Sequence, residues 1–332
     1  MIDDIELPTV SVIIPVYNVE DYIQKCVISL FEQSISSIEY IFIDDCSIDN
    51  SINIVKDTLK YYPNRLNQVK IIRNSINKGV SFSRQVGIEN ALGEFIAFCD
   101  PDDWIEKDMY LEMLKVAEYE NADIVGCNYV KEYKSKSIEC RENFLLNKDE
   151  LIHSIVIGGP VKGFLWNRLI RKRLFIENHI MFQPSLSLWE DMSVIIPLHI
   201  MCNKTGYVNE SYYHYRKTNK NSIGTLISTE KINSAIKATE YVESFLYKVD
   251  KHKDYEQPLA LMKINSKKLL LLDKNLYDPL KWFKTFQESN KYIFQTNYRV
   301  DLKIVMFLAG IKLFFPSKLR ILLLNTINTY RK

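Results

Sequence analysis

The sequence predicts an α/β protein: a doubly wound, mostly parallel sheet with helices on both faces, followed by a C-terminal helical region. Three observations support this fold class. Short apolar runs rich in β-branched residues alternate with segments of helical periodicity up to about residue 130. From about residue 229 to 273 the periodicity is helical throughout. The 332 residues are 47% hydrophobic and 25% charged, which is typical of a folded chain of roughly two domains and excludes collagen-like, disordered and low-complexity proteins.

The expected elements follow one another in βαβ order. Apolar runs predict strands over residues 10–14, 39–43, 69–73, 95–99 and 123–130. Helical spacing predicts helices over residues 21–31, 51–61, 81–92 and 104–121. Asn18 and Asp21 are placed as capping residues of the first helix, and Asp103 with Glu106 is placed as the capping box of a helix beginning at Trp104. Because such crossovers are right-handed and cover the sheet, this order predicts parallel strands.

Cysteine usage and charge limit the compartment and the partners. The six cysteines form no C-x-x-C pair and no zinc-like spacing with histidine, and the acidic N-terminus shows no secretory leader, so we expect a reducing, cytoplasmic location. Residues 1–199 hold 20 Lys+Arg against 30 Asp+Glu, whereas residues 200–332 hold 23 against 11. Either the basic half faces an anionic partner, or the halves neutralise each other across an interface. We find no nucleic-acid-binding motif and expect no nucleic-acid partner.

Ligands of doubly wound sheets bind beyond the carboxyl ends of the strands. Two carboxylate clusters follow predicted strands, at residues 44–47 and 100–103. Neither G-x-G-x-x-G nor G-x-x-x-x-G-K-[ST] occurs, so a phosphate loop of backbone amides is not expected. Asp100 and Asp102 have the spacing to hold Mn²⁺ or Mg²⁺, which would stabilise the charge on a departing nucleoside diphosphate. A helix cap would explain Asp103 alone and would leave the other two carboxylates without a role.

Five motifs lie in order within the first 104 residues: Val12-Ile-Ile-Pro-Val-Tyr-Asn18, Asp44-Asp-Cys-Ser47, Asp49-Asn-Ser51, Asn77-Lys-Gly-Val80 with Arg84, and Gly93-Glu-Phe-Ile-Ala-Phe-Cys-Asp-Pro-Asp-Asp-Trp104. In this order and spacing they resemble the motifs of family 2 glycosyltransferases. The resemblance is close over about residues 8–130 and looser up to about residue 225. It implies a GT-A fold and an inverting transfer of a sugar from a nucleotide-sugar donor, usually with Mn²⁺ or Mg²⁺.

The resemblance also implies roles for individual residues in the donor site. Pro15 and Tyr17 would bind the donor, with Tyr17 on or beside the base, and Asp45 would hydrogen-bond to the base. Asp100 would meet the ribose or nucleoside and would share the cation with Asp102. Tyr17 could instead be a packed aromatic at the end of its strand.

Three further positions leave alternatives open or depart from the family pattern. Arg84 would reach the donor phosphates, or would lie on a solvated helix face. Asp44 would belong to the carboxylate cluster after the second strand, or would only cap or pin its turn. Cys46 stands where the family pattern usually has Gly, so a positive φ at this position would strain the loop.

An inverting transfer needs a base that takes the proton of the acceptor hydroxyl. Trp189-Glu-Asp191, followed by apolar residues at helical spacing, resembles the acidic pair of the family at a helix start. This implies Asp191 as the base and Glu190 as the fallback. The competing interpretation makes Asp191 the N-cap of this helix, which Pro197 is expected to interrupt and kink.

Further segments of the second half resemble the family more loosely. Trp166, within Phe164–Ile170, would lie beside the sugar or acceptor, or would be a core aromatic. Tyr212–Arg216 with Asn221–Ile223 resembles a late loop that closes over the diphosphate. In it, Arg216 would contact the donor phosphate and His214 would lie on the metal side, unless this histidine is structural.

The predicted organisation is a GT-A catalytic domain over residues 1–225 and a helical region over residues 226–332. The nucleotide-binding part covers about residues 8–130 and the acceptor part about residues 131–225. In the helical region, the apolar stretches 304–315 and 319–324 are too short to span a bilayer. They predict either interfacial helices at the inner face of the cell membrane or a hairpin packed on the protein or a partner subunit.

The function predicted is an inverting glycosyltransferase of surface polysaccharide synthesis. It would be metal-dependent, of hexosyl or N-acetylhexosaminyl type, with a nucleoside-diphosphate sugar, a UDP-sugar foremost, as donor. The acceptor would be a saccharide or a lipid-linked saccharide. The alternatives are a nucleotidyltransferase, which would typically carry a basic Gly-rich loop after the first strand, and a catalytically silent protein that binds sugar nucleotides or polysaccharide.

Overall fold

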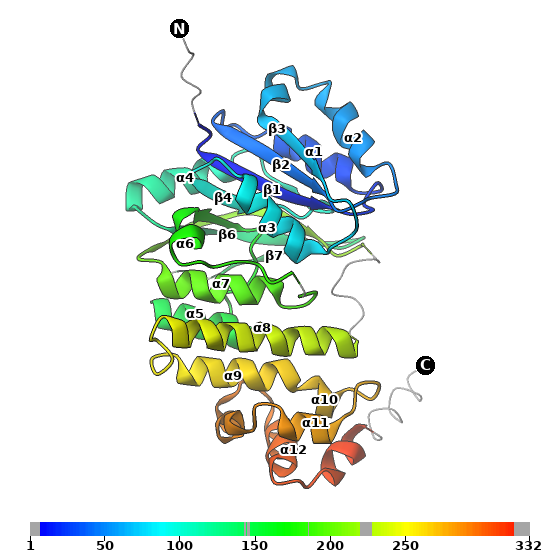
Figure 1. The fold of residues 1–332 in the computed structure, drawn as a ribbon, viewed down its shortest axis with the longest axis vertical. Helices are drawn as coiled ribbons and strands as arrows, with labels where there is room; N and C mark the ends of the chain where they lie inside the picture. Colours follow the sequence, from blue (N-terminus) through cyan, green and yellow to red (C-terminus); the bar gives the residue numbers. More distant parts are fainter. Residues whose placement is uncertain (1–6, 143, 145–146, 185, 220–227, 322–332) are drawn as a thin grey trace.

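The computed structural model describes residues 7–142, 144, 147–184, 186–219 and 228–321. Within these residues, nine strands form one sheet in the order β3-β2-β1-β4-β8-β6-β9-β5, with β7 paired to β6 (Figure 1). The strands are β1 Val10–Val16, β2 Ile38–Asp44, β3 Val69–Arg73, β4 Phe95–Phe98, β5 Trp104–Ile105, β6 Ile124–Glu132, β7 Ser137–Cys140, β8 Arg168–Arg171 and β9 Thr205–Arg216. Most strands run in one direction, and β5, β7 and β8 run against them, so the predicted mostly parallel sheet is confirmed.

The strands of the N-terminal half are parallel because helices connect each strand to the next, and these helices cover the apolar residues on both faces. In β1, Val12 pairs with Tyr40 of β2 and with Ala97 of β4. Successive side chains of a strand point to opposite faces. Accordingly Val12 and Ile14 belong to one buried cluster and Ile13 to the other. A central strand that is buried on both faces reads as a continuous apolar run, and this is why β1 is visible in the sequence.

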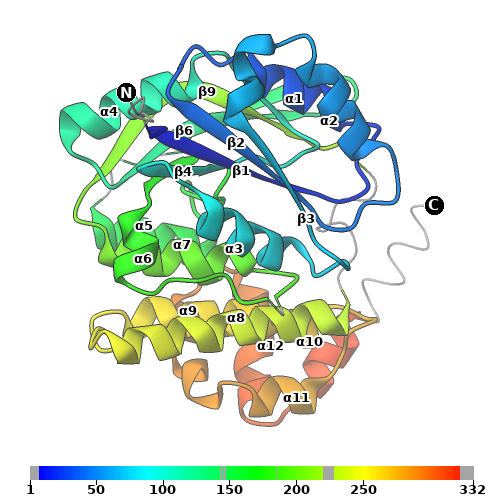
Figure 2. The same ribbon diagram turned by 45° about the horizontal axis from the view of Figure 1, so that its top comes forward.

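Helices cover both faces, as predicted (Figure 2). One face packs against α1 Ile23–Phe31, α2 Ser51–Leu59 and α4 Met109–Glu120; the 3₁₀ helix η1 Pro63–Gln68 precedes β3. The other face packs against α3 Val80–Asn90, α5 Lys148–Ile157, α6 Arg173–Glu177 and α7 Glu190–Met201. Gly87 lets α3 approach β1 closely, because a Cβ there would lie 2.3 Å from Cγ2 of Ile13. This contact packs the later turns of α3 against the middle of β1.

Two helix starts differ from the prediction. Trp104 begins the short strand β5, paired with His214 of β9, and not a helix. Asp103 is fully buried and bonds to β9, so the expected capping box with Glu106 is wrong; α4 begins later, after Asp108. The first helix has Tyr22 as its N-cap residue and no side-chain cap, so the capping roles of Asn18 and Asp21 are also wrong. Pairing with a strand more than 100 residues away makes Trp104 and Ile105 a strand, while the helix predicted for residues 104–121 forms as α4 over Met109–Glu120.

The C-terminal helices form a layer below the sheet domain (Figure 1). They are α8 Thr229–Lys248, α9 Glu256–Lys267, α10 Leu269–Leu272, α11 Pro279–Lys284, the 3₁₀ helix η2 Gln287–Gln295 and α12 Val300–Gly310. α8 packs on α7 and α9 on α5, while Leu271, Trp282 and Met306 centre a separate core. None of the helices in the described ranges has both the length and the hydrophobicity of a membrane span. The domain boundary at residues 225 and 226 stays a prediction.

Candidate active site at the carboxyl ends of the strands

A cleft of about 620 Å³ opens where β1, β2 and β4 end and where α3 and α7 begin. Its lining includes nine of the residues proposed from the sequence: Pro15, Tyr17, Asp45, Arg84, Asp100, Asp102, Trp166, Glu190 and Asp191. Segments up to 176 positions apart in the chain thus meet at the edge that the strand order predicted.

Arg84, on α3, is the centre of the charged groups in this cleft. Its Nη1 lies 2.5 Å from Asp191 Oδ1 and 3.3 Å from Glu190 Oε1, and its Nη2 lies 3.0 Å from Asp100 Oδ1. The Arg84 side chain is only 4% exposed, so these ion pairs are largely withdrawn from water. Arg84 therefore links the end of β4 to the start of α7. The alternative of a solvated helix face is wrong, and the predicted phosphate contact stays a prediction.

Burial changes the proton affinity of the groups that meet at Arg84. Desolvation raises the pKa of Asp191 to about 8; Arg84 opposes this rise, while Glu190 and Asp100 add to it. Burial by itself lowers the pKa of Arg84, but the three carboxylates outweigh burial and raise it above the ordinary value. An Asp with a pKa near neutrality is suited to take a proton in catalysis.

Asp191 lies in the first turn of α7 and is not its N-cap. That position belongs to Trp189, which has a left-handed backbone (φ +65°) and makes no side-chain cap. The helix continues through Pro197 to Met201, so the proline does not end it. The Asp191 carboxylate is consequently available to the cleft, which agrees with its prediction as the base and leaves that role to be tested.

The loop after β4 is held from behind by β9. Asp103 accepts hydrogen bonds from Tyr213 Oη at 2.8 Å and from the backbone N–H of Arg216 at 2.7 Å. Arg216 Nε donates to the backbone oxygen of Asp102 at 2.6 Å. Burial raises the pKa of Asp103 well above its usual range, and the two neighbouring carboxylates act in the same direction. Asp103 thus anchors the loop, while Asp100 and Asp102 face the cleft.

The carboxylates of Asp100 and Asp102 fit a divalent cation. Burial and the nearby Asp100 carboxylate raise the pKa of Asp102, whose Oδ2 accepts a hydrogen bond from Asn219 at 2.8 Å. A cation would offset this repulsion, and carboxylate oxygens are ligands that Mn²⁺ and Mg²⁺ prefer. In the described part of the chain no three His, Cys, Asp or Glu side chains cluster tightly enough to hold a metal. Donor phosphates and water would have to complete its coordination.

Asp45 organises the loop that leads into α3. Its carboxylate accepts hydrogen bonds from Asn74 Nδ2 at 2.8 Å, the Lys78 N–H at 2.9 Å and the Gly79 N–H at 2.7 Å. Gly79 has φ +86°, which a side chain would strain. Asp45 lies in the cleft, but these hydrogen bonds occupy much of its carboxylate. Its contact with the nucleotide base of the donor stays a prediction.

The turn after β2 is pinned by a second aspartate. Asp44 is buried and binds the Ser47 N–H at 2.8 Å and Arg73 Nη1 at 2.6 Å, so it pins the turn, as the sequence allowed. Cys46 adopts φ +65°, in the left-handed region where the family pattern has Gly. A non-glycine residue in this region carries about 1 kcal/mol or more of strain.

Three predicted residues make contacts inside the protein that compete with their predicted contacts. Trp166 lines the cleft, but it is 3% exposed and stacks between Phe164 and Tyr213, with centroid distances of 4.6 and 4.2 Å, so it is packed as a core aromatic is, and its contact with a sugar stays a prediction. Both ring nitrogens of His214 are bound by carboxylates, with Nδ1 2.8 Å from Glu132 and Nε2 2.7 Å from Glu106, which removes it from the metal side.

Arg216 is the third of these residues. Its guanidinium lies over the rings of Tyr22 and Trp104, behind the loop after β4, and not in the cleft. The segment 221–223, which the sequence grouped with it, lies outside the described residues. Tyr215 and Asn219 line the cleft instead and were not proposed from the sequence. Their place on β9 and just after it, beside the late family segment, was the only signal that could have found them.

Comparisons with known proteins identify a matching family and related sequences. The family model described as "Glycosyl transferase family 2" matches residues 11–183. The putative glycosyltransferase EpsH of Bacillus subtilis (strain 168) is 34% identical over 261 residues, which cover 76% of this chain and 74% of EpsH. The minor teichoic acid biosynthesis protein GgaA of the same organism is 30% identical over 223 residues, which cover 62% of this chain and about half of GgaA, 47%.

A solved structure resembles nearly the whole chain. The crystal structure of S. aureus TarS 1-349 in complex with UDP-GlcNAc has a TM-score of 0.72 at 20% identity, covering 97% of this chain and 91% of that one. At this identity the likeness concerns the fold, and it confirms the GT-A architecture that the sequence implied. The family match covers more than half of the chain, and the match to EpsH extends further. This chain belongs to glycosyl transferase family 2.

Proposed function

We propose that this chain is an inverting glycosyltransferase that moves a hexosyl or N-acetylhexosaminyl group from a UDP-sugar to a saccharide or lipid-linked saccharide. One observation carries the proposal. Asp191, with a pKa raised to about 8, lines the same cleft as Asp100 and Asp102, and Arg84 ties it to Asp100. A base in the same cleft as a carboxylate pair that can hold a cation is the set of groups that a single displacement at the anomeric carbon needs.

Each of these side chains has a separate role in the proposed reaction. Asp191 accepts the proton of the acceptor hydroxyl as its oxygen attacks the anomeric carbon, and the sugar–phosphate bond breaks on the opposite side. Arg84 holds the Asp191 carboxylate in place and balances the charge of Glu190 and Asp100. Asp100 and Asp102 would hold Mn²⁺ or Mg²⁺, which supplies charge stabilisation for the departing diphosphate.

The donor and the pathway are proposed from the relatives. The TarS structure is a complex with UDP-GlcNAc, and GgaA is a minor teichoic acid biosynthesis protein. A UDP-sugar donor and a role in surface polysaccharide synthesis are therefore the first choices for this chain. A lipid-linked acceptor would place the enzyme in the cytoplasm, in peripheral contact with the inner face of the cell membrane.

The donor site is tested by a thermal-shift panel with UDP, GDP and CDP, with and without Mn²⁺, on wild type and Asp102→Ala. A ligand at 100 times its Kd stabilises the fold by about 2.7 kcal/mol, enough for a shift of a few degrees in a chain of this size. We expect a Mn²⁺-dependent shift with UDP that is absent in Asp102→Ala. Equal shifts in the two proteins would remove Asp102 from the donor site, and no shift with any nucleotide would contradict the donor site and favour a silent protein that binds polysaccharide.

A further inference from the structure

We infer that the outer side of α12 and the turn that follows it form a surface that rests on an anionic lipid bilayer. We call this surface the α12 face; it consists of Val300, Ile304, Phe307, Ile311, Leu313 and Phe315. The inference extends the membrane position proposed above to a defined surface, and it does not depend on the chemistry of the cleft.

The α12 face is apolar and open to solvent. Val300, Ile304, Phe307 and Ile311 are 69, 46, 46 and 56% exposed, and their spacing of four, three and four residues places them on one side of the helix. The opposite side of α12 is fixed to the protein, because Met306 packs in the C-terminal core. The exposed stripe is thus held outward by packing on the other side of the same helix.

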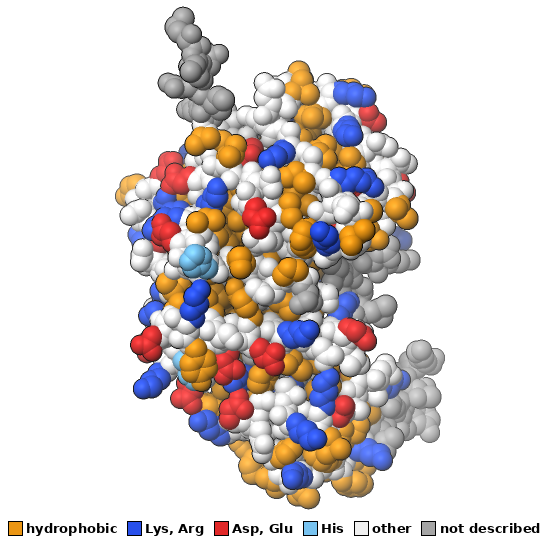
Figure 3. Space-filling model, viewed as in Figure 1, with side chains coloured by type: hydrophobic (Ala, Val, Ile, Leu, Met, Phe, Trp, Pro, Cys, Tyr) orange, Lys and Arg blue, Asp and Glu red, His pale blue; other side chains and the backbone are white. Residues whose placement is uncertain are grey.

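The apolar surface continues beyond the helix. Leu313 and Phe315 are 54 and 73% exposed, and the ring of Phe294 lies 5.5 Å from that of Phe307 at 55% exposure. Figure 3 shows hydrophobic side chains gathered over the lowest part of the molecule, where α11 and α12 lie, with Lys and Arg side chains among them. An exposed apolar patch of this extent, rimmed by polar groups, is typical of an interaction surface.

The charges around the α12 face identify its partner. Residues 299–321 contain five basic side chains, Arg299, Lys303, Lys312, Lys318 and Arg320, and a single acidic one, Asp301. Asp301 is bound to Arg299 at 3.0 Å, so it does not offset the other four. A second copy of the chain docking through this face would bring like charges together, whereas lipid phosphates would neutralise them. Apolar residues with a basic rim match the interface of an anionic bilayer.

Vesicle flotation of the full-length protein tests the inference. The vesicles contain phosphatidylcholine alone or with phosphatidylglycerol, and no sugar donor is present. We expect binding to the anionic vesicles to be at least tenfold stronger than to the neutral ones and to weaken at high salt. The variant Phe307→Asp with Phe315→Asp should bind the anionic vesicles at least tenfold more weakly. The control Tyr61→Asp with Tyr119→Asp changes two aromatic residues that are 83 and 94% exposed elsewhere, and it should bind as wild type does.

Several outcomes would overturn the inference. If wild type does not bind the anionic vesicles, the α12 face does not contact lipid. The same follows if Phe307→Asp with Phe315→Asp binds them as strongly as Tyr61→Asp with Tyr119→Asp. If wild type is a dimer by analytical ultracentrifugation and Phe307→Asp with Phe315→Asp is a monomer, while neither binds vesicles, the face joins two copies. A melting temperature within about two degrees of wild type shows that both variants are folded. Because no donor is used, failure here leaves the donor-site proposal untouched, and the nucleotide panel can fail independently.

Discussion

Arg84 is the residue on which the charge balance of the cleft depends. It bridges Asp100, Glu190 and Asp191, and its side chain is 4% exposed. Its Nε has no hydrogen-bond partner within the described residues, so the guanidinium is held by the ion pairs of Nη1 and Nη2. Removing one member of a buried charge network leaves the others uncompensated, which typically destabilises a protein by about 3–5 kcal/mol.

We therefore expect Arg84→Met to lower both the free energy of unfolding, by about 3 kcal/mol, and the rate of sugar transfer. Denaturant unfolding and a transfer assay measure the two effects. Arg141→Met is the matched control, because the side chains of Arg141 and its partner Glu139 are 69 and 48% exposed, and an exposed pair contributes about 1 kcal/mol or less. Equal destabilisation by the two substitutions would contradict the central place given to Arg84.

The pH dependence of transfer reports on Asp191. As a base, Asp191 acts only when ionised, and burial raises its pKa to about 8, so the transfer rate should increase as the pH rises towards and through 8. The Glu190 carboxylate contributes to this rise in pKa. Glu190→Gln should consequently move the midpoint of the pH–rate profile to lower pH. A flat profile, or a midpoint that moves up in Glu190→Gln, is the result that would exclude this assignment.

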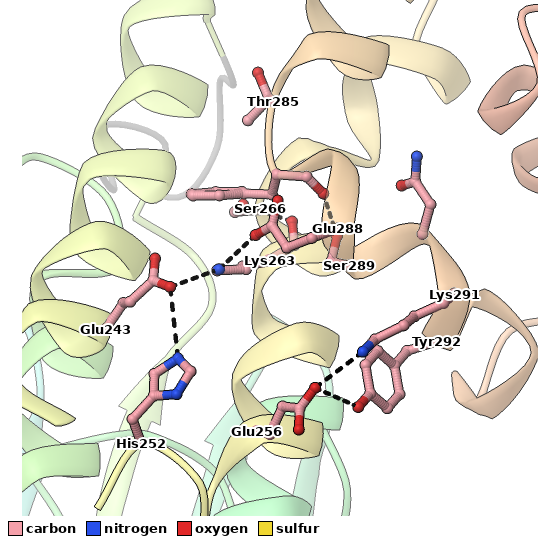
Figure 4. A network of polar contacts seen from close by, with 12 residues as sticks. Glu243, His252, Glu256, Lys263, Ser266, Thr285, Glu288, Ser289, Lys291 and Tyr292 are labelled. Atoms are coloured by element: carbon pink, nitrogen blue, oxygen red, sulfur yellow. Dashed lines mark hydrogen bonds and ion pairs between the residues drawn. The ribbon is translucent and has the colours of Figure 1, made fainter. Parts of the chain in front are cut away.

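At the scale of elements, buried lysines join α9 to its neighbours in the C-terminal region. Lys263 Nζ lies 2.8 Å from Glu243 of α8 and 2.6 Å from Glu288 of η2 (Figure 4). One turn further on, Lys267 Nζ donates to the backbone oxygen of Phe286 at 3.1 Å and to Asn290 Oδ1 at 2.9 Å. Lys267 is fully buried and its hydrogen-bond acceptors are neutral, so burial lowers its pKa to about 7.

This lysine predicts a specific change of stability with pH. Between the folded-state pKa of about 7 and the ordinary value of 10.5, the unfolded chain binds a proton at Lys267 that the folded chain releases. The contribution of Lys267 to the free energy of unfolding therefore rises with pH across that window, by about 1.4 kcal/mol per pH unit. Denaturant unfolding at pH 7 and pH 9 should give a more positive change of stability in wild type than in Lys267→Met, because the titration of Asp191, which lowers stability towards pH 8, is common to both proteins. The same pH dependence in both proteins would mean that Lys267 stays charged in the folded state.

The elements also show which parts of the fold could be predicted from the sequence. Strands β1 to β4 could be predicted because each is a short apolar run, and the carboxylates that follow them could be placed at one edge. The short strand β5 could not, since Trp104 becomes a strand only by pairing with β9. Strand β8 begins at the buried Arg168, whose partner Glu142 lies 2.7 Å away. Because Arg168 is charged, the hydropathy of the sequence does not indicate that this position is buried.

The site was predictable to the same degree. Motifs placed Asp102 and Asp191 in one cleft, but the bridge that Arg84 makes joins positions 106 and 107 residues apart, and local spacing carries no such information. Trp166 and His214 lie in segments that resemble the family, yet their side chains are taken up by stacking and by ion pairs. Which side chains reach the ligand depends on packing between β6, β8 and β9, which the sequence alone does not reveal.

For the whole molecule, the uneven charge of the chain agrees better with an anionic partner than with neutralisation between its halves. Across residue 199, the ion pairs among the described residues are Lys204 with Glu120 and His214 with two glutamates. The basic residues around the α12 face lie at the opposite end of the molecule from the N-terminal strands (Figure 1). A basic surface far from the N-terminal strands would be free to bind lipid, as we propose, while the cleft binds its substrates.

The most direct test of the account compares donor binding and sugar transfer in Asp191→Asn. This substitution keeps the size of the side chain and a hydrogen-bond acceptor for Arg84, but it removes the base. We predict UDP-sugar binding within about threefold of wild type by calorimetry, and a transfer rate reduced by about 10²- to 10⁴-fold, the usual contribution of a general base. A variant that keeps its transfer rate, or that loses donor binding together with transfer, would contradict the assignment of Asp191 as the base of this cleft.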